Sequence, residues 1–82
     1  MKGESAKCLS TWYEIIVART KAGPVLDTEA SGSMHGAQWA VRRFDALYGH
    51  AELIYVRQHC RGGRVRVLHD LTVRREGKVA QQ

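Results

Sequence analysis

One stretch of the chain, residues 33–49 (SMHGAQWAVRRFDALYG), has a helical pattern, and it limits what the rest can fold into. At about 100° per residue, its apolar side chains gather on an arc of about 140°, the width of a stripe that faces a core. That stripe consists of Met34, Ala37, Ala40, Val41, Phe44, Leu47 and Tyr48. Ser33 or Ser31 can cap the first turn, and Gly49 can end the helix in the left-handed conformation. Every other apolar run is short, so we expect a single helix packed on strands.

The opposite side of this helix carries a tryptophan among basic side chains: His35, Trp39, Arg42 and Arg43. They are neighbours because residues three and four apart lie side by side on a helix. Trp and Arg are enriched at binding hot spots, so the group is a candidate contact patch. The alternative is that the N-terminal tail or the loop at Pro24 covers Trp39. The sequence leaves both interpretations open.

The other apolar runs have the composition of strands. Residues 12–20 (WYEIIVART) are rich in β-branched and aromatic residues, and apolar side chains fall on both faces, which is typical of a central or doubly covered strand. Residues 25–29 are a candidate second strand that returns along the first after a Gly-Pro turn. Residues 51–60 and 64–74 are two further strand-like runs around a Gly-Gly pair.

The predicted fold class is therefore α+β, with one helix packed on a three- to four-stranded, mainly antiparallel sheet. The element order is β-β-α-β-β, or β-α-β-β if residues 25–29 are loop. The chain has 82 residues, which allows one domain. We place that domain at residues 12–74, between flexible tails at 1–11 and 75–82.

The Gly-Gly pair also predicts a register for the last hairpin. If Gly62 and Gly63 form a two-residue turn, Arg61 faces Arg64 across the ribbon. One face of the ribbon is then largely apolar, with His69 on it as a buried neutral imidazole. The other face collects the polar side chains: Tyr55, Arg57, His59, Arg61, Arg64 and Arg66. A one-residue slip would mix the two sets, so the pattern favours this register.

Charge is distributed unevenly along the chain. Residues 1–56 hold six basic and six acidic residues, whereas residues 57–82 hold seven basic and two acidic ones, so the last third carries the whole net charge of +5. Such asymmetry indicates a polyanionic partner or an acidic protein surface. Arginine suits bidentate contacts to phosphate, and a sheet with an aromatic among basic residues can bind single strands. The alternative is a solvated charged edge that prevents aggregation.

We therefore expect a non-enzymatic module that binds nucleic acid or a nucleoprotein complex through an Arg-rich hairpin. The candidate residues are Arg57, His59, Arg61, Arg64, Arg66 and Tyr55, with Trp39, Arg42 and Arg43 as a second patch. The alternative is an inhibitor or adaptor that binds an acidic surface of a larger protein machine, anchored by Trp39, Trp12 and Tyr55. In size and style alone the chain resembles phage and plasmid accessory proteins, including anti-CRISPR proteins, and this resemblance transfers no residue. A homodimer formed by edge strands is compatible with either function.

Several classes of chemistry lack a motif in this sequence. No nucleophile, base and orienting group are placed together, so neither an enzyme nor a cofactor is expected. Cys8, His59, Cys60 and His69 lack the paired short spacings of a zinc site. No apolar run approaches 18 residues and the first ten residues lack an apolar core, so we expect no membrane partner and a cytoplasmic location. In that compartment the two cysteines should be free thiols, with a Cys8–Cys60 bridge as the alternative.

Overall fold

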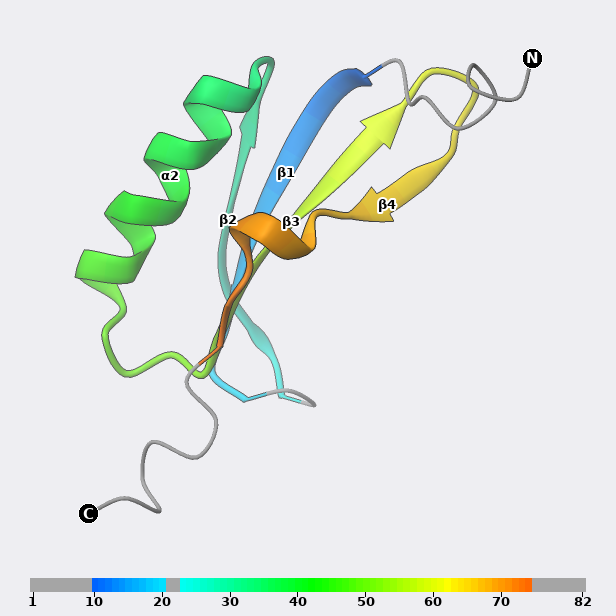
Figure 1. Cartoon of the computed structure of the whole chain (residues 1–82). Coiled ribbons are helices and arrows are strands. Elements are labelled where there is room, and N and C mark those ends of the chain that lie inside the picture. The colour runs from blue at the N-terminus through cyan, green and yellow to red at the C-terminus, as the bar shows by residue number, and fades with distance from the viewer. Residues whose placement is uncertain (1–9, 21–22, 75–82) are drawn as a thin grey trace.

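The structure is a computed structural model, and it describes residues 10–20 and 23–74. One helix packs on one face of a mainly antiparallel sheet, which confirms the predicted α+β class (Figure 1). The elements are β1 (Ser10–Ala18), β2 (Val25–Ser31), α2 (Met34–Leu47), β3 (Leu53–Cys60), β4 (Val65–Val67), the 3₁₀ helix η1 (His69–Leu71) and β5 (Val73–Arg74). The remainder of both predicted tails, residues 1–9 and 75–82, lies outside the described residues. No helix within the described ranges is long and apolar enough to cross a membrane.

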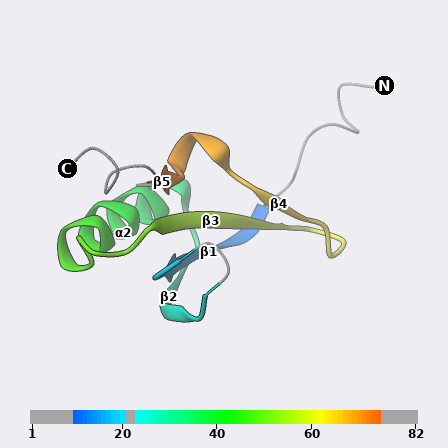
Figure 2. The ribbon, with the colours of Figure 1, turned by 90° about the horizontal axis from the view of Figure 1, so that it is seen from below.

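The strands lie in the order β2-β1-β3-β4, and β5 also pairs with β3. β1 is central, as its two apolar faces predicted, because it pairs antiparallel with β2 on one edge and with β3 on the other. The candidate strand at residues 25–29 forms as β2 and continues to Ser31. Viewed from below, α2 lies on one side of the sheet (Figure 2). We call the sheet face turned away from α2 the outer face.

The core lies between the sheet and α2. Alternate residues of the two central strands point into it, since successive side chains of a strand face opposite sides. Its buried members are Tyr13, Ile15 and Val17 of β1, Ile54 and Val56 of β3, Ala37, Ala40, Val41 and Phe44 of α2, and Ala51. Phe44 is the largest apolar side chain that α2 buries.

Helix α2 begins as the sequence predicts and ends earlier. Ser33 is the N-cap, and its hydroxyl accepts a hydrogen bond from the Gly36 amide at 3.0 Å. The buried stripe is narrower than predicted, because Met34 and Leu47 at its two ends are exposed. The expectation that Gly49 ends the helix in a left-handed conformation is wrong. The helix ends at Leu47, and a turn in which the Ala51 amide donates to the Tyr48 carbonyl leads into β3 without a positive φ.

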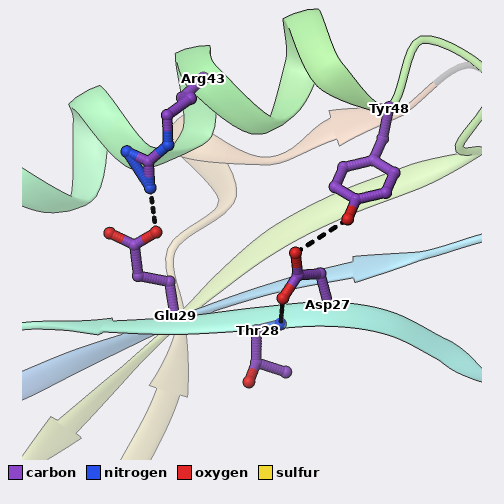
Figure 3. Close-up of polar contacts among 5 residues, drawn as sticks. All are labelled: Asp27, Thr28, Glu29, Arg43 and Tyr48. Carbon is purple, nitrogen blue, oxygen red and sulfur yellow. Dashed lines mark hydrogen bonds and ion pairs between the residues drawn. The ribbon is translucent and has the colours of Figure 1, made fainter.

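Polar contacts tie α2 to the edge strand β2 (Figure 3). Arg43 forms an ion pair with Glu29. The hydroxyl of Tyr48, at the end of the helix, donates to Asp27 Oδ2 at 2.8 Å. Asp27 Oδ1 in turn accepts a hydrogen bond from the Thr28 amide at 2.8 Å. Both acidic residues of β2 therefore face the helix, and the outer face of this strand carries no charge.

The predicted register of the last hairpin is wrong by one residue. The loop has three residues, Arg61 to Gly63, because the Cys60 amide donates to the Arg64 carbonyl at 2.7 Å. Gly62 and Gly63 have φ values of 86° and 93°, and a positive φ at the third turn residue is what a type II turn requires. Arg57 therefore pairs with Val67, where a two-residue turn would have paired it with Leu68.

The chain after β4 does not continue as a strand. The Leu68 amide donates to the Val56 carbonyl at 2.9 Å, and the backbone then turns into η1 before rejoining β3 as β5. Leu68, Leu71 and Val73 pack against the core as a result. His69 begins η1 and is exposed, so the prediction of a buried histidine opposite Val56 is wrong. Because the three residues of η1 are not part of the strand, the side chains that reach the core differ from those that strand alternation predicts.

Candidate functional site

Aromatic and charged side chains gather on the outer face, where β1 and β3 lie side by side. Trp12 of β1 pairs with His59 of β3, and their rings stack with centroids 3.9 Å apart and planes 5° apart. Trp12 remains 37% exposed. Arg57 lies two residues before His59 on β3, and its guanidinium is 6.0 Å from the centre of the Tyr55 ring. We call Trp12, Glu14, Tyr55, Arg57 and His59 the platform.

Glu14 holds the platform together from the middle of β1. Its Oε1 lies 2.9 Å from His59 Nε2 and 3.4 Å from Arg57 Nε. The carboxylate therefore orients the His59 ring and offsets part of the positive charge of Arg57. Arg57 keeps 42% of its side chain exposed in spite of this contact. The platform thus presents ring surface and a fixed cation to solvent.

Strand β4 extends the platform with apolar side chains. The observed register places Val65 beside His59 and Val67 beside Arg57, and paired residues point to the same face of a sheet. Both valines are exposed, at 46% and 40%. A one-residue slip thus replaces the arginines predicted on this face with apolar surface.

The arginines of the hairpin do not share one face, contrary to prediction. Arg61 is in the exposed loop, and Arg66 pairs with Gln58, which points toward α2. Arg66 borders a pocket of about 360 Å³ together with Met34 and Gln38 of the helix. The predicted like-charge pair of Arg61 with Arg64 therefore does not form. Positive charge surrounds the hairpin tip on both sides instead of lining one face.

The second predicted patch, on α2, is only partly assembled. Trp39 is 56% exposed, so the described part of the loop at Pro24 does not cover it, and the N-terminal tail, the other predicted cover, lies largely outside the described residues. Its indole Nε1 donates to His35 Nε2 at 3.0 Å, and the Arg42 guanidinium lies 5.6 Å from the ring centre. Arg43 does not belong to this group, because it turns to Glu29 of β2. The helix patch is therefore His35, Trp39 and Arg42.

The cysteine chemistry differs from expectation. Cys60 is buried and disulfide-bonded, so the prediction of a free thiol at this position is wrong. That prediction assumed a reducing compartment, in which disulfides are rare. The other cysteine of the chain, Cys8, lies outside the described residues. A cytoplasmic location stays a prediction.

No protein family, curated protein or solved structure matches this chain. Its function is therefore inferred from its own side chains. In the part of the chain that the structure describes, no three His, Cys, Asp or Glu residues are grouped closely enough to hold a metal ion. What the described residues do bring together is stacking surface and cations, which suit binding.

The sequence indicates Trp12 only as an anchor of the protein-binding alternative, and it does not single out Glu14, Val65 or Val67. Alternation along β1 puts Trp12 and Glu14 on one face, so part of the signal was present. The pairing of Trp12 with His59 could not be predicted, because β1 and β3 are far apart in the chain and the helix between them does not determine how the two strands align. The two valines were misplaced by the register error in the hairpin.

Proposed function

We propose that this protein is a non-enzymatic module that binds single-stranded nucleic acid across the outer face, next to its basic hairpin. The stacked pair of Trp12 and His59 beside Arg57 is the observation that carries the proposal. Exposed aromatic rings stack on bases of any sequence, and neighbouring arginines contact the phosphates. A single strand fits better than a duplex because only unstacked bases offer their flat faces.

The charge around the platform supports this choice of ligand. Residues 53–69, which span β3, the loop and β4, contain four arginines and two histidines and no acidic residue. Glu14 is the one acidic side chain of the platform, and it is only a quarter exposed. A phosphate backbone on this face therefore approaches cations and little opposing charge. Apolar Val65 and Val67 add surface for sugars and bases.

The proposal is tested by fluorescence anisotropy with labelled single-stranded and double-stranded DNA and RNA, titrated with salt. We expect binding to single strands, with a log–log salt slope of about −3 to −5, because a few phosphates are neutralised. Equal affinity for duplexes would show that bases are not read by stacking. No binding to any nucleic acid at low salt would refute the proposal.

Charge reversal at the hairpin tip provides the matching variants. Arg61→Glu combined with Arg64→Glu should abolish binding and leave the fold intact, since Arg61 lies in an exposed loop and Arg64 directly follows it. Single variants Arg61→Glu and Arg42→Glu lower the net charge equally but act on opposite sides of the molecule. Arg61→Glu should weaken binding about tenfold or more, whereas Arg42→Glu should change it less than about threefold. Equal losses would indicate a general charge effect.

The helix patch favours a second candidate, a module that binds an acidic surface of another protein. Trp39 is more exposed than Trp12, and Arg42 lies over its ring, a combination typical of interface anchors. This candidate replaces the first if nucleic acids fail to bind at low salt. Trp39→Ala should then be the variant that loses the partner, and Arg61→Glu should retain it.

A further inference from the structure

A pocket of about 280 Å³ opens on the outer face, at the end of β3 opposite the hairpin tip. Its walls combine apolar, aromatic and basic side chains: Ala18, Leu53, Tyr55, Val67, His69 and Arg74. The volume lies just below the range of about 300–1,000 Å³ typical of pockets for drug-sized molecules. It therefore suits a small flat group, and a larger ligand would not fit.

The pocket and the platform lie along the same strand. Leu53, Tyr55, Arg57 and His59 are alternate residues of β3, so their side chains share one face. Tyr55 belongs to both features, because its ring lies near Arg57 and also lines the pocket. A ligand that leaves the platform along β3 in the direction away from the hairpin therefore reaches the pocket.

We infer that this pocket receives one unstacked base of the single strand that the platform binds, and the inference rests on the proposed function. Ala18, Leu53 and Val67 provide apolar contact for the ring, and Tyr55 provides a face for stacking. Arg74 borders the pocket, so a phosphate next to the inserted base lies close to positive charge. The occupant has one chemical class, a nucleobase attached to its phosphate backbone.

The distance between the two features sets the length of strand that engages both. His59 and Leu53 are six residues apart on β3, which corresponds to about 20 Å at roughly 3.3 Å per residue. Stacked nucleotides of one strand advance about 3.4 Å each, so about six nucleotides span this distance, and fewer when bases are spread apart. Affinity should therefore increase with length up to about six nucleotides and then level off.

The test combines a pocket variant with abasic oligonucleotides. Ala18→Leu fills the pocket, because Ala18 is a wall residue of β1 on the outer face. Labelled hexamers with one abasic site at each position in turn are titrated against the wild type and the variant by anisotropy. In the wild type, an abasic site at one position near an end should lower the affinity about tenfold more than an abasic site at any stacked position does. In Ala18→Leu that excess should vanish, which is the signature of a coupled pair.

The outcomes separate this inference from the proposed function. If hexamers bind but each abasic site costs the same factor in both proteins, no base enters the pocket and the inference is refuted. If no oligonucleotide binds at low salt, the proposed function fails and the inference fails with it. Circular dichroism checks the fold of Ala18→Leu. Should that variant not fold, Val67→Ala removes an exposed wall of the pocket instead and should diminish the same excess.

Discussion

The ring of Trp12 is the side chain on which the proposed binding depends most. It is stacked on His59, which Glu14 holds in place, so the ring is already ordered before a base arrives. An ordered ring binds with less loss of conformational entropy than a mobile one. The helix patch offers a matched control, because Trp39 is also exposed but lies on the opposite side of the molecule.

Trp12→Ala should therefore reduce affinity for single strands by about 1–3 kcal/mol, the usual contribution of one base stacked on one aromatic ring. Trp39→Ala should change it by less than about 0.5 kcal/mol. Anisotropy titrations at one fixed salt concentration measure both variants. A larger effect of Trp39→Ala would move the binding surface from the sheet to the helix.

Tyr48 links α2 to β2 and gives the fold a pH dependence. Its hydrogen bond to Asp27, followed by burial and the charge of that carboxylate, raises the pKa of Tyr48 above its ordinary value of 10.0. The folded chain thus holds the phenolic proton more tightly than the unfolded chain does. This contribution to stability is complete below about pH 10 and decreases as the pH rises further.

Tyr48→Phe lacks both the hydroxyl and this titration. We expect the variant to be less stable than the wild type at about pH 8, and the difference to shrink as the pH rises above about 10. Urea unfolding at a series of pH values measures it. A difference that stays constant across this range would show that the Tyr48 proton does not contribute.

At the scale of elements, the hairpin loop depends on two glycines. Gly62 and Gly63 have positive φ values, a region in which a side chain is strained. Gly62→Ala or Gly63→Ala should each lower the free energy of unfolding by about 1–2 kcal/mol. Gly49→Ala is the control, since Gly49 has no positive φ and an added Cβ would contact nothing within 4 Å. Urea unfolding compares the three, and an equal loss in the control would contradict the strain argument.

The same hairpin shows how far the sequence predicts an element. The apolar alternation of residues 51–60 correctly located β3, because eight residues of regular strand keep their phase. In the following run, the alternation of side chains between the two faces shifts twice, first at the three-residue loop and then at η1. A period of two predicts faces only while the backbone remains a strand, so Leu68 reached the core from a position that alternation assigns to the opposite face.

For the molecule as a whole, local patterns predicted the architecture well. The cap at Ser33, the buried stripe around Phe44 and the central place of β1 all follow from short stretches of sequence. The candidate site was harder to predict, because it depends on pairing between strands that a helix separates. Residues such as Trp12 and His59 come together only once the order β2-β1-β3-β4 is known.

The interruption of the last strand limits how copies of this molecule can assemble. At the β4 edge an added strand would find three regular positions before η1 turns the backbone away, whereas β2 offers seven. Two copies that join through β2 leave only the short, interrupted edges at their ends. Such a pair would offer only short edges for further strand addition, which disfavours extension of the sheet into a fibre.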